Sequence, residues 1–207
     1  MWFPIIVGVL ASYMLGNVNG AVIISALMHD DVRKHGSGNA GLTNFIRNYG
    51  TAKALFVIII DAAKAVLSCL LTGLLLEPYG MYSEGVMIGG TAVILGHVFP
   101  ALLGFRGGKG ILSGLFIAFV ADWRIAVAII VIFFAIYLIT RYVSLGSVLA
   151  AIGFAAGFCI LHHDEPIVMI CAIATAALTI FMHRSNIVRL CTGKESKTNL
   201  FKKGKSV

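Results

Sequence analysis

The chain has 207 residues, of which 59% are hydrophobic and only 12% charged, whereas a soluble domain is about 45–50% apolar and about 25% charged. So few charged side chains cannot cover a soluble domain of this length, which excludes a soluble enzyme, a disordered chain and a disulfide scaffold. The sixteen basic and nine acidic residues give a net charge of +7, which we attribute to membrane topology and an anionic ligand, not to nucleic acid.

Continuous apolar runs follow one another along the chain and predict an all-α integral membrane protein. The runs cover residues 3–25, 52–76, 86–103, 111–121, 125–140, 144–161 and 167–182. A helical span needs about 20 residues, and the fourth run would rise only about 16 Å. That run must borrow from the glycine-rich segment before it, or enter the membrane without crossing. We therefore predict a polytopic bundle of about seven transmembrane helices in a single domain over 1–207, with five or six spans as alternatives.

The segments between the runs alternate in charge. The basic segments are 29–51, 104–110, 140–143 and 183–207, and the other segments are 77–85, 122–124 and 162–166. Basic loops stay in the cytoplasm, which predicts an N-terminus outside and a C-terminus in the cytoplasm. Residues 192–207 are predicted to form a disordered polybasic cytoplasmic tail that touches anionic lipid.

The first segment rich in functional groups covers residues 35–47. Its glycines let the backbone turn several N–H groups toward one point, and a helix is predicted to start near Thr43 with its positive end facing the same place. The candidate phosphate-binding residues are Ser37, Gly38, Asn39, Thr43, Asn44 and Arg47. The alternative is a polar loop whose arginine only helps to keep the loop on the cytoplasmic side.

The second such segment covers residues 96–110. It is not a P-loop, because only three residues separate Gly104 from the Gly108-Lys109 pair and glycine follows the lysine. Its glycine-rich turn beside two cations still suits an oxyanion, and the candidates are Arg106, Gly107, Gly108 and Lys109. His97 is a candidate general base, a phosphate ligand, or a buried side chain bonded to a neighbouring helix.

Two further segments carry weaker signals. Ser144 and Ser147 are three residues apart and would share one face of a helix, where small residues also favour helix contacts. His183 and Asn186 would also share a helical face, although this segment could be an interfacial helix end.

Polar residues also fall inside the first two runs. Asp61 and Lys64 lie one turn apart near the middle of the second run, where isolated charges are costly, so we expect them to pair or to face a polar cavity. Asn17 and Asn19 in the first run are candidates for contacts between helices.

Three motifs together resemble one known family. They are Gly36-Ser37-Gly38-Asn39-x-Gly41-x-Thr43-Asn44-x-x-Arg47, then Gly96-His97-x-Phe99-Pro100 with Phe105-Arg106-Gly107-Gly108-Lys109-Gly110, and His183-Arg184-x-Asn186-Ile187-x-Arg189-Leu190 with Gly193 and Glu195. In this order they resemble the bacterial acyl-phosphate:glycerol-3-phosphate acyltransferases, the PlsY family. The chain departs from the family's usual residues at Asn17-Val18-Asn19, Leu42 and Ile111-Leu112-Ser113.

The resemblance implies a seven-span enzyme of the bacterial inner membrane whose site faces the cytoplasm. It would move a fatty acyl group from acyl phosphate to the 1-hydroxyl of sn-glycerol 3-phosphate, giving lysophosphatidate and phosphate in the first step of phospholipid synthesis. We expect no metal, because no carboxylate cluster lies in the basic segments, and no cofactor. The expected partners are membrane lipid and the enzyme that makes acyl phosphate, and the expected state is a monomer or weak oligomer.

The same resemblance implies roles for individual residues. Ser37, Arg47, Lys109, His183 and Asn186 would hold the phosphates, and Thr43 and Asn44 would shape the reacting centre. Of the two serines in the third segment, Ser147 is favoured over Ser144.

The sequence leaves open the mechanism of acyl transfer and two alternative functions. No Ser-His-Asp set or reactive cysteine is evident, which favours direct acyl transfer over an acyl-enzyme. The base could be His183, His97 or a substrate phosphate, and we favour the phosphate because its second pKa is about 6. The alternatives to an acyltransferase are a transporter of phosphate or small organophosphate anions, and a structural membrane subunit that binds lipid headgroups.

Overall fold

The computed structural model describes residues 2–198, and these residues form helices and connecting turns without a strand. The α-helices are α1 (Trp2–Gly16), α2 (Gly20–Leu27), α3 (Leu42–Tyr49), α4 (Thr51–Leu76), α5 (Tyr82–Val98), α6 (Ile111–Ala121), α7 (Trp123–Thr140), α8 (Val143–Leu161), α9 (Pro166–Met182) and α10 (Arg184–Cys191). Short 3₁₀ turns lie at Val32–Lys34, Glu77–Tyr79 and Ala101–Leu103. The all-helical prediction is confirmed.

Five segments of residues 2–198 are long and apolar enough to cross a membrane. They are Trp2–Leu27, Thr51–Tyr79, Tyr82–Leu103, Trp123–Thr140 and Val143–Leu161. A sixth follows if α9 and α10, which meet at a bend of 57°, count as one broken span. Helix α6 has 11 residues and stays too short to qualify alone, as its sequence predicted. By length and composition, the structure therefore supports the lower alternatives of five or six spans.

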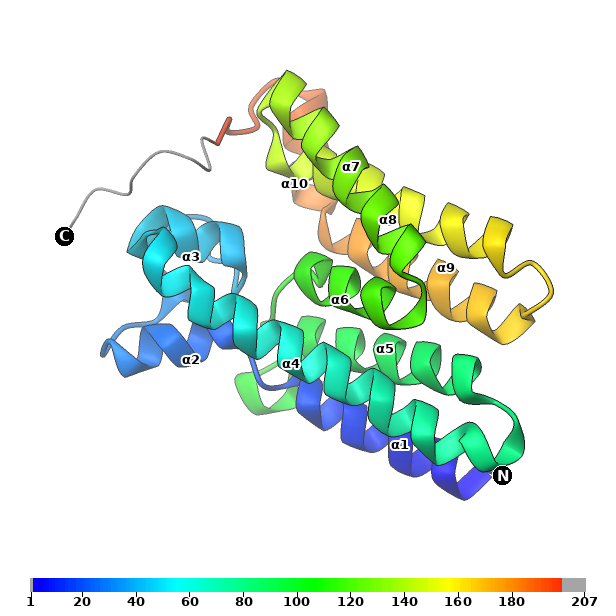
Figure 1. The fold of residues 1–207 in the computed structure, drawn as a ribbon. Coiled ribbons are helices and arrows are strands. Elements are labelled where there is room, and N and C mark those ends of the chain that lie inside the picture. Colours follow the sequence, from blue (N-terminus) through cyan, green and yellow to red (C-terminus); the bar gives the residue numbers. More distant parts are fainter. Residues whose placement is uncertain (1, 199–207) are drawn as a thin grey trace.

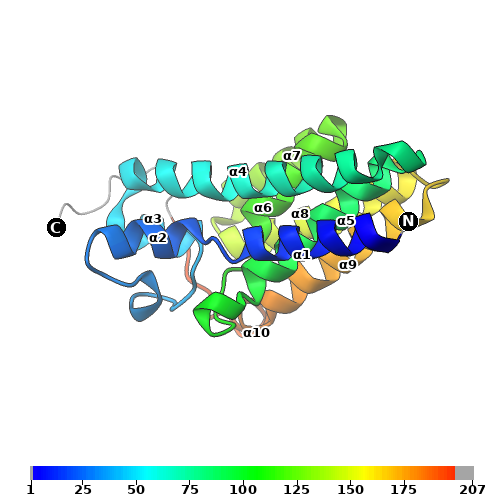
Figure 2. The same cartoon turned by 90° about the horizontal axis from the view of Figure 1, so that it is seen from below.

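The helices form two groups with α6 between them (Figure 1). Helices α1, α4 and α5 pack side by side, and α7, α8 and α9 form the second group. Contacts between α5 and α9 join the groups, and α6 touches helices of both. Figure 2 shows α2 and α3 together beyond the end of α1, next to the amino-terminal part of α4. This leaves one end of the bundle surrounded by loops and short helices.

The first apolar run does not form one helix over 3–25, because the chain breaks between α1 and α2. Asn19 caps α2 by accepting from the backbone N–H of Val22 at 3.0 Å, and donates to the carbonyl of Ala40 at 3.0 Å. Asn17 accepts from the backbone N–H of Leu102 at 2.9 Å. The two asparagines are thus bonded to distant loops, and at the break the carbonyl of Val18 accepts from Lys64 while the N–H of Gly20 donates to Asp61.

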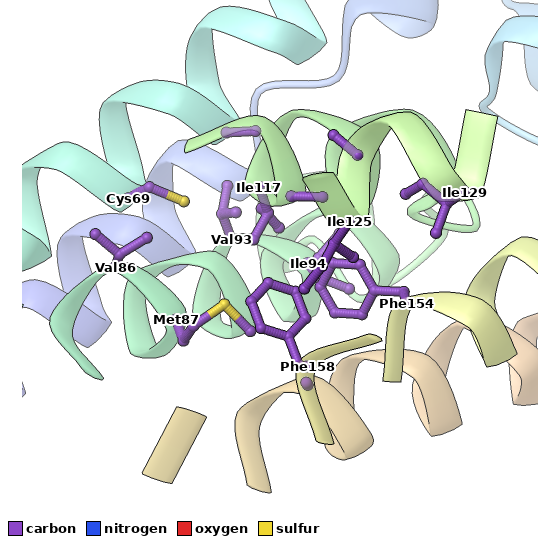
Figure 3. Close-up of a cluster of buried hydrophobic side chains, with 14 of the residues drawn as sticks. Cys69, Val86, Met87, Val93, Ile94, Ile117, Ile125, Ile129, Phe154 and Phe158 are labelled. Atoms are coloured by element: carbon purple, nitrogen blue, oxygen red, sulfur yellow. The ribbon is translucent and has the colours of Figure 1, made fainter. Parts of the chain in front are cut away.

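A cluster of buried side chains fills the middle of the bundle (Figure 3). It includes Cys69 from α4, Met87 and Ile94 from α5, Ile117 from α6, Ile125 from α7, and Phe154 and Phe158 from α8. These helices hold their relative positions through this core, which fixes the loops at the end of the bundle where polar residues gather.

Candidate active site

A cavity of about 1060 Å³ opens between the loops at this end and the helices below them. Its polar lining comes from the segment 36–47, Lys109, the start of α8, the end of α9, α10 and Glu195. Its apolar lining comes from the bodies of α6, α7, α8 and α9, including Leu115, Ile129, Phe133 and Phe154. The cavity therefore joins a cationic polar end to an apolar passage.

Most of the predicted site residues meet in this cavity although they are distant in sequence. Those that line it are Ser37, Gly38, Asn39, Thr43, Asn44, Arg47, Lys109, Ser144, Ser147, His183 and Asn186. Arg106, Gly107 and Gly108 are outside the lining, and Arg106 is exposed.

The two glycines before Lys109 pack against the end of α5. The backbone N–H of Gly108 donates to the carbonyl of His97 at 3.1 Å, so it is not turned toward a ligand. A methyl group on Gly107 would lie 1.9 Å from that same carbonyl oxygen, and one on Gly108 would lie 2.1 Å from His97 Nε2. Close packing requires glycine here, and it sets the position from which Lys109 reaches the cavity.

Asn44 organises the loop of the first motif. Its side-chain nitrogen lies 3.1 Å from the carbonyl of Val32 and 3.0 Å from that of His35, and its oxygen accepts from the N–H of Ser37 at 3.0 Å. The side chain is buried and occupied by these loop contacts. Asn44 lies in the first turn of α3 and thus shapes the preceding loop, which carries Ser37. Helix α3 begins at Leu42, one residue before the predicted start.

Glu195 lies at the centre of the polar network on the other side of the cavity. Its Oε1 accepts from Asn186 Nδ2 at 2.8 Å and from Ser144 Oγ at 2.7 Å, and its Oε2 accepts from Arg189 Nε at 2.7 Å. Burial raises the pKa of this carboxyl group, but the three hydrogen bonds and the nearby arginine outweigh burial and lower it overall. The group is therefore held as a carboxylate.

Glu195 and Arg189 also line the cavity, although neither is among the site residues predicted from the sequence. A signal was present, since Glu195 is the single acidic residue among seven basic ones over 183–207. An isolated carboxylate in such a segment needs a reason, and its three donors supply one.

Lys109 and His183 complete this side of the site. Lys109 Nζ donates to the amide oxygen of Asn186, and burial, with repulsion from Arg189 and Arg47 partly offset by Glu195, lowers its pKa to about 8. His183 Nδ1 lies 2.8 Å from the carbonyl of Thr179. That carbonyl can only accept, so Nδ1 carries the proton and Nε2 is left with a lone pair.

Asp61, Lys64 and His97 form a buried polar group beneath the loops. Lys64 Nζ lies 2.8 Å from Asp61 Oδ1, 2.7 Å from His97 Nδ1 and 2.7 Å from the carbonyl of Val18. The predicted pairing of Asp61 with Lys64 is confirmed. Of the three interpretations of His97, the structure agrees with a buried side chain that is bonded to a neighbouring helix. The group ties the break after α1 to α4 and to the end of α5.

The chain after α10 returns across the cavity instead of leaving the protein. The backbone N–H of Thr198 donates to the carbonyl of Arg141 at 3.0 Å, and Tyr137 donates to the carbonyl of Thr198 at 3.1 Å. Arg47 donates to the Thr198 hydroxyl from the opposite side. Residues 194–198 thus lie within the predicted tail but are folded, while its remainder, residues 199–207, lies outside the described residues.

The arrangement agrees with comparisons to known proteins. Residues 6–193 match the family model described as glycerol-3-phosphate acyltransferase. The chain belongs to the glycerol-3-phosphate acyltransferase family. The match covers the first two motifs and the third as far as Gly193, whereas Glu195 lies two residues beyond it.

Curated glycerol-3-phosphate acyltransferases match over nearly their whole length. The protein of Finegoldia magna is 37% identical over 196 residues, which are 94% of this chain and 96% of that protein. The Aquifex aeolicus protein is 34% identical over 195 residues, covering 91% and 96% of the two chains.

Solved structures of a glycerol-3-phosphate acyltransferase also share the fold. A crystal structure of PlsY (YgiH), an integral membrane glycerol 3-phosphate acyltransferase, in its glycerol 3-phosphate form, superposes with a TM-score of 0.86 at 33% identity, covering 96% of this chain and 99% of the other. Its lysophosphatidic acid form gives 0.83 at 32% identity, with coverages of 95% and 96%. This chain therefore shares both the family and the fold of an integral membrane acyltransferase.

Proposed function

We propose that this protein transfers a fatty acyl group from acyl phosphate to the 1-hydroxyl of sn-glycerol 3-phosphate, giving lysophosphatidate and phosphate. The observation that carries the proposal is the union of a cationic polar end and an apolar passage in one cavity. Both substrates carry a phosphate, and the donor also carries a long apolar chain. A site for this reaction must accommodate both chemistries side by side.

We also propose that the polar end faces the cytoplasm of a bacterial inner membrane, with the N-terminus outside. Basic loops favour the cytoplasmic side, and the lining segments around Arg47, Lys109 and Arg189 belong to the basic set. The predicted seven crossings would consist of the five long apolar segments and two more. One would be α6 together with the loop before it, and the other would be α9 without α10. Soluble glycerol 3-phosphate would then enter from the cytoplasm and the acyl donor from the membrane.

Lys109 and Arg47 are proposed to hold the phosphate groups, because they are the predicted cations that line the polar end. Ser37, Ser144, Ser147 and Asn186 would add neutral hydrogen bonds, and His183 a further contact. Glu195 would not bind phosphate, since a carboxylate repels it. Its role would be to orient Asn186, Ser144 and Arg189 around the anions.

The chemistry is proposed to be direct transfer. The glycerol hydroxyl oxygen attacks the acyl carbonyl carbon, the bond from that carbon to the phosphate oxygen breaks, and the departing phosphate keeps the electron pair. Lys109 would stabilise the charge that develops on the leaving group. The hydroxyl proton would pass to a substrate phosphate, or to His183 Nε2, whose lone pair is free for it.

The test uses the purified protein in detergent with radiolabelled glycerol 3-phosphate and three donors in parallel: palmitoyl phosphate, palmitoyl-CoA and palmitoyl carrier protein. We expect labelled lysophosphatidate from palmitoyl phosphate alone, and its loss in Lys109→Ala. Product from the thioesters alone would overturn the proposed donor while leaving an acyltransferase. No product, together with uptake of labelled glycerol 3-phosphate into proteoliposomes, would favour the transporter.

A further inference from the structure

The face of α8 that lines the cavity changes abruptly in side-chain size. Ser144, Ser147 and Ala151 follow one another at intervals of three and four residues, so they form one stripe along the helix. The next residue of this stripe is Phe154, which also lines the cavity. Helix α8 rises about 15 Å from Ser144 to Phe154, at about 1.5 Å per residue. The side chains of this stripe are therefore small from the polar end down to Ala151, and the next one, Phe154, is large.

Phe154 separates the cavity from the sealed core. Its ring centroid lies 4.9 Å from that of Phe158, which is fully buried and does not line the cavity (Figure 3). Ile129 of α7 is likewise both a member of the core cluster and a lining residue. Below these two side chains the interior is closed by packed residues.

The other helices leave space above this floor. Gly114 of α6 lines the cavity, and nothing lies within 4 Å of where its side chain would begin. On α9, the residues that line the passage include Ala176 and Thr175, which are small. Small residues of α6, α8 and α9 therefore line part of the passage, beside larger ones such as Leu115 and Phe133, and the passage ends at Phe154 and Ile129.

We infer that Phe154 and Ile129 form the floor of the acyl-chain passage and set the length of acyl chain that the enzyme transfers best. The inference rests on the proposed function, because it takes the occupant of the apolar passage to be the acyl chain of the donor. A chain that ends at the floor fills the passage. A longer chain meets Phe154 before its phosphate end reaches the polar site, and a shorter chain leaves apolar surface uncovered.

The expected size of the effect follows from pocket specificity. One methylene more or less in a hydrophobic pocket changes kcat/KM by about 10–200-fold. Here the floor is the end of a long passage, so we expect the lower part of that range. The alternative is a passage that releases the chain sideways into lipid, since Phe134 lines the cavity and is 42% exposed. In that arrangement the floor would not affect chain length.

The experiment measures kcat/KM with lauroyl, myristoyl, palmitoyl, stearoyl and arachidoyl phosphate for the wild type and four variants. Phe154→Ala and Phe154→Leu lower the floor and are expected to move the optimum toward longer donors. Ala151→Leu places a larger side chain one turn above the floor and is expected to move the optimum toward shorter donors. We expect relative kcat/KM values to change by about tenfold, with the KM for glycerol 3-phosphate unchanged.

Val86→Ala is the matched control, because Val86 belongs to the same buried core, does not line the cavity and lies away from Phe154 (Figure 3). It should lower thermal stability and keep the wild-type chain-length profile. The opposite shifts of Phe154→Leu and Ala151→Leu keep the test valid if Phe154→Ala fails to fold. Wild-type transfer with the same profile in every folded variant would overturn this inference alone. A wild type that transfers from no acyl phosphate would overturn the proposed function and this inference with it.

Discussion

Asn186 Nδ2 donates to Glu195 Oε1 at 2.8 Å, while the amide oxygen of Asn186 accepts from Lys109. A carboxylate can only accept and an ammonium can only donate, so these two neighbours fix which end of the amide faces which way. Lys109 is thereby linked to α10 and to the segment after it. The position of the lysine in the cavity depends on a carboxylate that lies beyond the last helix.

Replacing Glu195 by glutamine should impair the site without removing any proposed phosphate ligand. Arg189, Asn186 and Ser144 would lose a charged acceptor, and hydrogen bonds to charged groups contribute about 1.5–3 kcal/mol each. We expect kcat/KM to fall by at least about tenfold. Steady-state kinetics with both substrates would measure this. The neighbouring Lys194→Gln, at an exposed position, is the control, and equal activity of the two variants would contradict the role of Glu195.

The pH dependence of activity should report Lys109. Its pKa is lowered to about 8, chiefly by burial, so the ammonium is present below that pH and is lost as the pH rises through it. If the charged lysine stabilises the leaving phosphate, kcat/KM should fall above about pH 8. Lys109→Arg keeps its charge throughout, so any remaining activity should lack this alkaline limb. An identical limb in the arginine variant would assign it to another group.

Thr198→Val should free Arg47. In the absence of substrate, the Thr198 hydroxyl accepts a hydrogen bond from the Arg47 guanidinium, which is the proposed phosphate ligand. A net hydrogen bond contributes about 0.5–1.5 kcal/mol, so its removal should lower the KM of the substrate that binds Arg47 by a few-fold. Thr192→Val is the matched control, since that hydroxyl is exposed and bonds only to carbonyls of α10. A raised KM in Thr198→Val alone would mean that Thr198 holds Arg47 in its productive position.

Breaking the buried pair of Asp61 and Lys64 should destabilise the protein more than removing both charges. Each side chain is 2% exposed, and removing one partner of a buried pair costs about 3–5 kcal/mol because the other charge stays uncompensated. We expect Asp61→Asn and Lys64→Met each to lower the unfolding temperature in detergent, and the double variant to recover part of the loss. A double variant whose loss equals the sum of the two single losses would show that the charges do not interact.

The sequence by itself determined the class, the family and many of the residues at the polar end of the cavity. The excess of apolar residues required a membrane protein, because only lipid can solvate that much apolar surface. The motifs around Ser37, Lys109 and His183 indicated the family and supplied residues that meet in one cavity. Asp61 and Lys64 could be paired in advance because both lie on one helix, where local geometry fixes their separation.

Contacts between distant segments decided the rest. The break after α1 depends on Asn17 and Asn19 bonding to Leu102 and Ala40, which no pattern inside the first apolar run could predict. Glu195 belongs to the site only because its segment returns to Ser144, and Phe154 ends the passage only because Phe158 and the core close the space beneath it. Hydropathy and motif spacing report local preferences. The shape of the cavity is a sum of long-range packing contacts, and only the folded chain brings those residues together.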